Sequence, residues 1–564
     1  MYRTHNCGEL RKSNINDKVI LSGWVNSIRS MKNKFFIDLR DFYGITQLLI
    51  YKRKIKIKNE YLINISGLVI KRKFPNLKIK TGYIEILVNK YKILNKSIKL
   101  PFNIKDKIKK NNINLLTYRY LYIRNIKIKN NLIIKSNLLN IIRHFFIKEK
   151  FLEIETPILV KETSEGANNF IVPYRKSKGL FYSLPQSPQT FKQLLMIGGI
   201  DKYYQIAKCF RDEDIRKDRQ PEFLQLDIEM SFVKIKQIYL LIKKFLKYIF
   251  LKIHKIKLIN IKKITYKKII NKYKTDKPDL RYKIYKIKIK NKYFKKKFLK
   301  YKIFSIILPN YLNIKNILKF NIRLFLKQYV CKKENIIIYN LNLNIFNYKN
   351  IFKNNKIIKK IINKYFFSKF DILLILLIPK SNNKKIWQIK KKINEFLFRS
   401  KYNKEIYIPI FIYKFPLFKL NKLKNIYECY HHPFTKPWNN KNKITKDMLA
   451  QSYDLIINGI EIGSGSIRID KNIIQKKIFS FIGLSKLNIK KNFNFFLKAL
   501  NYGTPPHGGI GIGIDRLILS LFNKKNIQDI IAFPKNYLNK DIMINTPTKI
   551  DKKKLLKLGL KIIK

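Results

Sequence analysis

The first hundred residues alternate apolar and polar side chains in short runs. These runs are separated by turn-forming residues and cover 18–28, 34–41, 43–51, 61–73 and 83–94. Alternation with a period of two places the apolar side chains on one face of a strand. Several short strands in this arrangement predict a small β-barrel or sandwich at the start of the chain.

The pattern changes after residue 100. Residues 100–128 predict a connector, and from Leu132 to Lys150 apolar side chains recur at helical spacing. The next segment, FLEIETPILV, predicts a strand that ends near Pro157. A helix followed by a strand therefore opens a second domain.

The strictest alternation in the chain lies at 223–231. Its odd positions are Phe223, Gln225, Asp227, Glu229 and Ser231, and its even positions are Leu224, Leu226, Ile228 and Met230. This pattern predicts a strand with one face turned to a polar ligand, with Arg211 at the end of the preceding strand. On this segment alone, a solvated hairpin whose charges pair with one another remains the plainer interpretation.

The composition is strongly basic. Lys+Arg number 121 and Asp+Glu 35, which gives a formal net charge of +86. A polyanionic partner is one explanation, but the lysines are spread over almost the whole chain and are not gathered on one face. Compositional drift therefore explains most of the excess, and electrostatic selection a smaller part. Residues 285–404 share this composition without glycine or motif, and we interpret them as an inserted domain.

Some classes of protein are excluded. The longest clean apolar run, Ile372 to Ile378, is far shorter than the roughly 20 residues that span a bilayer, so we expect no membrane association. The N-terminus lacks the apolar core of a signal peptide, which predicts a cytoplasmic protein. The four cysteines lie far apart without metal-site spacing, and free thiols are expected.

Two carboxylates flank a turn signal. Asp454 and Glu461 would point to opposite faces of an unbroken strand, but Asn458-Gly459 can supply a turn or bulge that brings them together. Such a pair suits Mg²⁺, which completes its shell with substrate phosphates. Two unrelated surface acids on a hairpin are the alternative.

Glycines gather in GTPPHGGIGIGIDRL, at 503–517. They precede a helical segment that carries Arg516, and their spacing is not that of a dinucleotide-binding fold. Bare backbone beside a guanidinium suits a phosphate or a purine. Glycines that only let a helix pack closely on a strand are the alternative. Gly463 and Gly465, before Arg468, likewise predict a close approach to the backbone.

These segments together resemble the class II aminoacyl-tRNA synthetases, and more narrowly the bacterial-type aspartyl-tRNA synthetases. FLEIETPIL resembles motif 1, FRDED with RQPEFLQLDIEM motif 2, and GIGIGIDRL motif 3. TSEGANNF, LPQSPQTFKQLLM, TDKPDLR, HHPFTKP and INGIEIGSGSIRI also match. The resemblance covers about 1–235, 264–281 and 405–545.

The resemblance implies an α+β multidomain protein. The implied parts are an N-terminal OB-fold β-barrel that binds the anticodon (1–105), a hinge (106–135), an antiparallel-sheet catalytic domain in two parts (136–284 and 405–564) and an inserted α+β domain (285–404). Motif 1 implies a homodimer. The implied activity is ATP-dependent activation of L-aspartate, followed by transfer to tRNA(Asp), with ATP as substrate and Mg²⁺ as cofactor.

The resemblance also implies roles for matching residues. The catalytic residues are Arg211, Glu461 and Arg516. The aspartate contacts are Glu165, Ser187, Gln189, Lys192, Arg211, Asp227, His431 and Arg468, of which Lys192 and Arg468 grip the side-chain carboxylate. The ATP contacts are Arg211, Asp212, Glu213, Gln220, Phe223, Glu461, Gly513, Ile514, Asp515 and Arg516. The magnesium ligands are Asp454 and Glu461, and the anticodon contacts are Arg29, Phe36 and Gln47.

Two alternatives are weighed against this assignment. An RNA-binding relic without catalysis would be free to lose the site residues, yet four of them persist amid heavy drift: Arg211, Glu461, Arg468 and Arg516. Asparaginyl-tRNA synthetases lack the TDKPDLR element and the large insertion. The family's arginine run after GWV is reduced to one arginine here, and Met31 or Lys32 stands where a histidine accompanies relaxed tRNA choice, so the sequence leans toward tRNA(Asp) and leaves tRNA(Asn) open.

Overall fold

The computed structural model describes most of the chain in two compact units. The described residues are 1–104, 113–162, 167–215, 218–258, 260–273, 275–281, 285–287, 301–308, 336–340, 372–379, 407–421, 423, 425–439, 444–524 and 526–563. The units are Met1–Asn114 and Leu115–Lys564.

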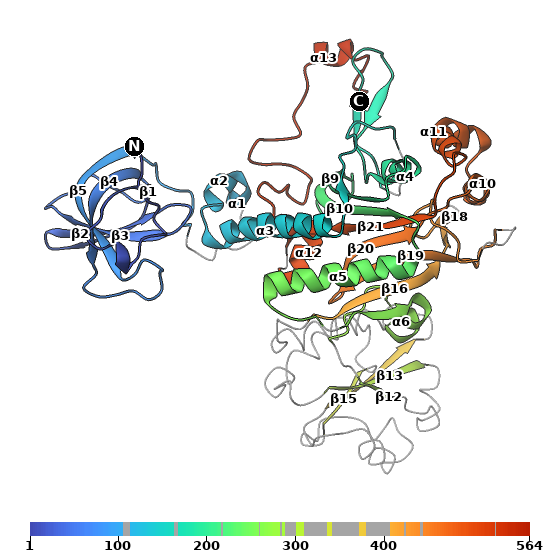
Figure 1. The fold of residues 1–564 in the computed structure, drawn as a ribbon, viewed down its shortest axis with the longest axis horizontal. Helices are drawn as coiled ribbons and strands as arrows, with labels where there is room; N and C mark the ends of the chain where they lie inside the picture. The colour runs from blue at the N-terminus through green and yellow to red at the C-terminus, as the bar shows by residue number, and fades with distance from the viewer. Residues whose placement is uncertain are drawn as a thin grey trace. The chain divides into compact units, whose positions relative to one another are not determined.

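The first unit is a closed five-stranded barrel (Figure 1). After a short 3₁₀ turn, η1 (Lys12–Asn14), its strands are β1 (Lys18–Met31), β2 (Lys34–Arg40), β3 (Ile45–Tyr51), β4 (Leu62–Lys71) and β5 (Ile84–Asn95). They pair in the order β1-β2-β3-β5-β4, and only β3 and β5 run parallel. The alternating residues fill the barrel, with Val19, Leu21 and Val25 at most 1% exposed. The predicted barrel is confirmed.

An eight-stranded sheet forms the centre of the second unit (Figure 1). Its order is β11-β16-β19-β20-β21-β10-β9-β6, antiparallel except for the edge pairs β11-β16 and β6-β9. The bounds are β6 Leu152–Glu153, β9 Lys202–Phe210, β10 Glu222–Ser231, β11 Lys262–Thr265, β16 Pro409–Pro416, β19 Leu449–Ile457, β20 Ile460–Ile467 and β21 His507–Gly513. This is the antiparallel-dominated catalytic sheet that was expected.

Helices cover one face of this sheet. α3 (Ile126–Lys148), α5 (Ile235–His254) and α12 (Ile514–Leu521) share one hydrophobic core with the sheet, and Figure 1 shows α3 and α5 lying across it. The even-numbered Leu226 and Ile228 of β10 are fully buried in this core. The odd-numbered side chains of β10 therefore face the other side, as the period of two predicts.

Smaller elements surround the sheet. They are α1 (Asn114–Thr117), α2 (Arg119–Tyr122), β7 (Ile171–Pro173), β8 (Phe181–Ser183), α4 (Gln189–Ile197), α6 (Tyr266–Tyr273), β17 (Phe418–Asn421), β18 (Ile426–Cys429), α10 (Asn472–Phe481), α11 (Lys486–Ala499), η6 (Ile527–Asp529) and α13 (Lys552–Lys557). In the predicted insertion, the described residues form a separate antiparallel sheet, β12-β13-β15-β14 (Tyr285–Ile287, Tyr301–Leu308, Ile372–Pro379, Ile336–Asn340).

The structure differs from the expected elements at two places. Helix α3 begins at Ile126 and not near Leu132, because the Asn125 side chain accepts a hydrogen bond from the Lys127 backbone N–H and caps the helix there. The strand expected from Phe151 onward is confined to Leu152 and Glu153. Among the helices of the described chain, none is long and apolar enough to cross a membrane.

Candidate active site

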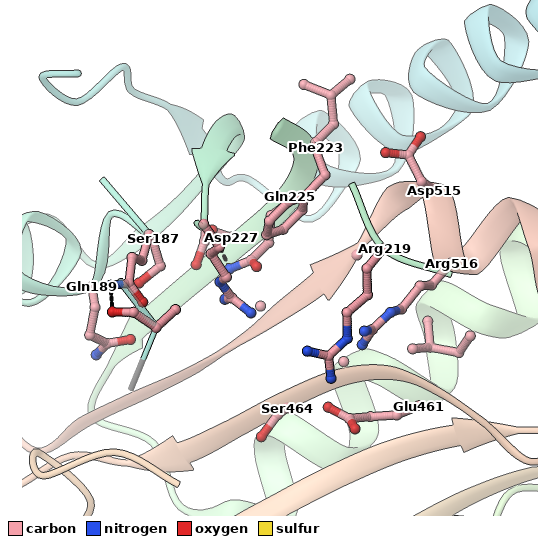
Figure 2. Close-up of a pocket in the computed structure, with 18 of the residues that line it drawn as sticks. Ser187, Gln189, Arg219, Phe223, Gln225, Asp227, Glu461, Ser464, Asp515 and Arg516 are labelled. Carbon is pink, nitrogen blue, oxygen red and sulfur yellow. Dashed lines mark hydrogen bonds between the residues drawn. The ribbon is translucent and has the colours of Figure 1, made fainter. Parts of the chain in front are cut away.

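A cavity of about 360 Å³ opens on the face of the sheet that the odd positions of β10 occupy. Phe223, Gln225 and Asp227 line it together with residues from β20, β21, the start of α4 and the start of α12. Figure 2 shows these residues converging on one space. The strand predicted to face a polar ligand does line the cavity, and its charges are not those of a solvated hairpin.

Four charged side chains are buried together beside the cavity. Lys192 Nζ donates to Asp227 Oδ1 at 2.8 Å and lies 3.4 Å from Glu229 Oε2. Arg468 Nε donates to Glu229 Oε1 at 2.8 Å. All four side chains are 4% exposed or less. We call Lys192, Asp227, Glu229 and Arg468 the charge quartet. Its formal charge is zero.

The cations of the charge quartet favour the ionised form of Glu229. Burial opposes ionisation of Glu229, but the charges of Arg468 and Lys192 outweigh it and hold the pKa of this carboxyl below its ordinary value. Arg468 also donates to Ser466 Oγ at 2.8 Å. The two cations expected to grip a substrate carboxylate are therefore already held in place by internal acids.

The two carboxylates expected to bind metal lie on one face of the sheet. Asn458 and Gly459 form the turn between β19 and β20, both with positive φ, and a register shift follows Leu455. The predicted turn and bulge are confirmed. Glu461 lines the cavity, whereas Asp454 is not one of the lining residues and contacts His431, which is.

A basic side chain lies beside each of these two carboxylates. Lys277 Nζ lies 2.5 Å from Glu461 Oε2, and His431 Nε2 lies 3.1 Å from Asp454 Oδ1. Burial opposes ionisation of Glu461, but Lys277, Arg516 and His431 lower its pKa. Among the described residues, no group of three or more His, Cys, Asp or Glu side chains is placed to hold a metal.

Arginines lie at the end of the cavity that Glu461 lines, away from Ser187 and Gln189 (Figure 2). Figure 2 shows Arg219 and Arg516 side by side, opposite Glu461. Arg219 pairs with Glu213, and Arg516 NH2 lies 3.5 Å from Asp218 Oδ2. The Arg211 guanidinium lies 5.1 Å from the centre of the Phe223 ring.

Several buried polar atoms of the cavity wall have no hydrogen-bond partner among the residues that the structure describes, including His431 Nδ1 and Asp515 Oδ2. Two of these atoms are N–H donors, Gln189 Nε2 at the start of α4 and Arg211 Nε. A buried donor without a partner is costly. Both donors therefore suit a ligand with oxygen acceptors.

Glycines of β20 and β21 lie at the cavity and beside it. An added Cβ at Gly509 would collide with Ile228 O and Glu229, and one at Gly511 would lie 2.5 Å from Gln225 Nε2. These two glycines therefore make room for the polar side chains of β10. Gly463 and Gly465 both line the cavity, although a Cβ at Gly465 would lie 2.8 Å from Tyr453 Cε2 in the core. The close approach of a ligand to their backbone stays a prediction.

Several expected contacts take other positions. Ile514 is fully buried in the hydrophobic core and does not line the cavity, because it begins the buried face of α12. Asp212 is exposed and also lies outside the lining residues. The Gln220 side chain lines the cavity but exchanges two hydrogen bonds with the Lys535 backbone, at 3.2 and 2.9 Å. Glu165 lies outside the described residues.

The remaining expected residues line the cavity. They are Ser187, Gln189, Lys192, Arg211, Glu213, Gln220, Phe223, Asp227, His431, Glu461, Arg468, Gly513, Asp515 and Arg516. Segments far apart in the sequence are thus brought to one place. Asp515 also reaches back to α3, where Lys135 Nζ donates to its Oδ1 at 2.6 Å.

In the barrel, the three expected anticodon residues lie on adjacent strands. Arg29 of β1 faces Phe36 of β2 and donates to Gln47 Oε1 at 2.9 Å. The Gln47 amide also donates to Glu85 Oε2 at 2.6 Å, and Gln47 is only 3% exposed. Arg29 is exposed and Phe36 is half-buried, whereas both ends of the Gln47 amide are engaged. Asp38, which accepts from Ser27 and Arg29, belongs to the same network.

Sequence reasoning missed four residues of the cavity region. The alternation at 223–231 puts Gln225 and Glu229 on the polar face of the strand, so the sequence could have indicated both. Arg219 lies in motif 2, but nothing in that segment indicates that it pairs with Glu213. Lys277 stands in TDKPDLR, where the spacing gives no hint that it reaches Glu461.

The comparisons with known proteins agree with this arrangement. Residues 111–537 match the family of tRNA synthetases class II (D, K and N), and residues 19–94 match the OB-fold nucleic acid binding domain. An aspartate–tRNA ligase of Buchnera aphidicola subsp. Acyrthosiphon pisum is 40% identical over 589 residues, and one of Mycoplasma capricolum is 40% identical over 579 residues. In both cases the match covers 100% of each chain.

Solved structures share the fold at lower identity. The asparaginyl-tRNA synthetase of Pyrococcus horikoshii complexed with asparaginyl-adenylate has a TM-score of 0.61 at 18% identity, covering 95% of this chain and 98% of its own. A putative aspartyl-tRNA synthetase of Leishmania major has a TM-score of 0.58 at 18% identity, covering 93% and 92%. On the full-length sequence matches, the chain belongs to the aspartate–tRNA ligases within the class II tRNA synthetases.

Proposed function

We propose that this protein activates L-aspartate with ATP to aspartyl adenylate and transfers the aspartyl group to the 3′ end of tRNA(Asp). The observation that carries the proposal is the buried charge quartet beside a cavity with unpartnered donors. Aspartate and asparagine differ by one negative charge at the end of the side chain. A pair of cations held in fixed positions favours the carboxylate of aspartate over the neutral amide of asparagine.

The quartet supplies groups for both ends of the amino acid. Lys192 and Arg468 retain N–H groups for the side-chain carboxylate, and Asp227 offers acceptor oxygens to the ammonium. With its amide oriented as in the structure, Gln189 offers a donor to a carboxylate oxygen. The resemblance implies an aspartate contact for Gln189, and this orientation directs that contact to a carboxylate oxygen.

The first chemical step needs charge neutralisation more than proton transfer. An oxygen of the aspartate α-carboxylate forms a bond to the α-phosphorus of ATP, the bond from this phosphorus to the bridging oxygen breaks, and pyrophosphate leaves. Arg211 and Arg516 are the cations for the phosphates, and Phe223 is the ring for the adenine. In the second step a hydroxyl of the terminal adenosine attacks the carbonyl carbon and AMP leaves.

Glu461 and Asp454 are the residues that would hold Mg²⁺. Their donor set fits the ion, because Mg²⁺ takes one or two carboxylates and completes its shell with phosphate oxygens and water. The Lys277 ammonium on Glu461 supports this, since it shows that the carboxylate accepts a cation there. Bound Mg²⁺ would neutralise the phosphates and orient them.

The proposal extends to the rest of the molecule. Arg29 and Phe36 would contact the anticodon from the barrel, and stacking of one base on Phe36 is worth about 1–3 kcal/mol. The enzyme would work in the cytoplasm as a homodimer. Exposed apolar side chains around motif 1 support the dimer; they are Ile147, Leu152, Ile158 and Leu159. Sedimentation at micromolar concentration tests it, and a fully active monomer would contradict it.

Pyrophosphate exchange tests the activity. Exchange should depend on aspartate and run on the order of 10⁴-fold better than with asparagine or glutamate. Aminoacylation of tRNA(Asp) and tRNA(Asn) side by side then tests the tRNA. Equal exchange with asparagine would overturn the assignment.

A further inference from the structure

The segment that follows the barrel in the chain reaches the nucleotide end of the cavity through a buried arginine. Arg119 of α2 is 3% exposed and donates to three backbone carbonyls. These belong to Gln528, Ile531 and Ala532, at 2.7, 2.6 and 2.7 Å. All three hydrogen bonds therefore go to a single loop, residues 526–536, which includes η6.

A second buried residue binds the same loop. Asn131 of α3 is 4% exposed and its Nδ2 donates to Asp529 O at 2.9 Å. Two side chains, 12 positions apart in the sequence, thus bind four of the five backbone carbonyls of residues 528–532. We call Arg119 and Asn131 the loop clamp.

The clamped loop forms part of the cavity. Ile527 lines it directly. Gln528 Nε2 donates to Lys535 O at 3.0 Å, and Lys535 in turn exchanges two hydrogen bonds with Gln220 at the cavity wall. Gln220 stands two residues before β10 begins at Glu222. The contacts therefore run without a gap from Arg119 to the wall near Phe223.

A purely structural role explains these contacts poorly. A buried guanidinium loses much hydration, and an apolar side chain of similar volume would fill the same space at less cost. Arg119 instead fixes three carbonyls in direction, which an apolar side chain cannot do. Carbonyls that point in fixed directions hold the loop in one conformation, and this conformation keeps the residues of a ligand site in position.

We infer that Arg119 is a positioning residue for ATP, which acts through the 526–536 loop and Gln220 and not by touching the substrate. The inference rests on the proposed function, because it assumes that this end of the cavity takes ATP. It adds a residue of the connector to the nucleotide site. At the aspartate end, the hydrogen bonds of Lys192 and Arg468 involve neither residue of the loop clamp.

Two variants of the full-length protein test the inference. In pyrophosphate exchange without tRNA, Arg119→Met should raise KM for ATP about 10- to 100-fold and leave KM for aspartate within about twofold. Arg119→Lys retains one charge-assisted donor and should fall between Arg119→Met and the wild type. The matched control is Arg143→Met on α3, since Arg143 pairs with Glu153 at the surface and is 44% exposed.

A second readout keeps the test independent of catalysis. ATP binding measured by calorimetry without aspartate should weaken by the same factor as KM in both variants, while far-ultraviolet circular dichroism stays unchanged. Equal rises of both KM values, or unchanged ATP binding in a folded Arg119→Met, would overturn the inference. Loss of aspartate-dependent exchange in the wild type with ATP binding intact would instead contradict the proposed function alone.

Discussion

The charge quartet predicts how much aspartate specificity depends on one lysine. In Lys192→Met a side chain of similar length loses its charge, and the formal charge of the quartet falls from zero to −1. A substrate carboxylate then loses an ion-pair partner, whereas asparagine, which is neutral, loses little. The ratio of kcat/KM for aspartate to that for asparagine therefore reports the lost interaction.

The magnitude follows from the distances. Lys192 already pairs at 2.8 and 3.4 Å, so a bound carboxylate would sit at ion-pair distance, about 4 Å. At an effective dielectric constant of about 20 this interaction is worth about 4 kcal/mol. Since about 1.4 kcal/mol is a factor of ten, the ratio should fall by about 10²- to 10³-fold.

The measurement must separate specificity from stability. Removal of one partner from a buried ion pair costs about 3–5 kcal/mol, so less of the variant will be folded. The two substrates are therefore compared in one enzyme preparation, where that loss cancels. Lys208→Met is the matched control, because Lys208 pairs with Glu222 at 2.8 Å with half of its side chain exposed. A folded Lys192→Met with an unchanged ratio would show that the lysine does not hold the substrate carboxylate.

Three further predictions concern other parts of the site. Glu461→Ala should abolish pyrophosphate exchange and leave tRNA binding by filter assay nearly intact; parallel loss of both would mean that Glu461 maintains the fold. Burial holds the pKa of His507 below its ordinary 6.5, so the stability that its neutral form contributes is present above about pH 6.5 and is lost as the pH falls through the folded pKa. Between pH 7 and pH 5 the apparent Tm of His507→Gln should therefore fall less than that of the wild type. An equal fall in the two proteins would contradict this. Gly509→Ala should destabilise by about 1–3 kcal/mol or more in urea unfolding, since its Cβ meets Ile228 O, whereas Gly513→Ala, with nothing nearer than 3.7 Å, is the tolerated control.

Local patterns predicted the fold where packing follows from periodicity. The strand at 223–231 shows this, since its even positions are in the core and its odd positions face the cavity. The turn at Asn458-Gly459 was predicted because few residues adopt two successive positive φ angles. The start of α3 was missed because Asn125 acts through a single capping bond that hydrophobic spacing does not register.

The site was harder to predict where long-range pairing decides a role. Arg468 and Glu229 are 239 positions apart, and nothing in either segment indicates that they pair. The glycines of β20 and β21 looked equivalent in the sequence. The antiparallel register turned Gly509 toward Glu229 and Gly465 toward Tyr453, and only the three-dimensional pairing decides this.

The pairing of the cavity cations has a consequence for a chain with a formal net charge of +86. Its exterior attracts any polyanion, and long-range attraction does not distinguish one RNA from another. Arg219 and Arg516 of the cavity wall each already have an internal counterion, and so does Lys277, which pairs with Glu461 of that wall. An entering phosphate gains only the difference between two ion pairs unless it brings a cation for the displaced carboxylate. At these three cations an entering anion therefore replaces an internal carboxylate, whereas the exterior attracts polyanions without such an exchange.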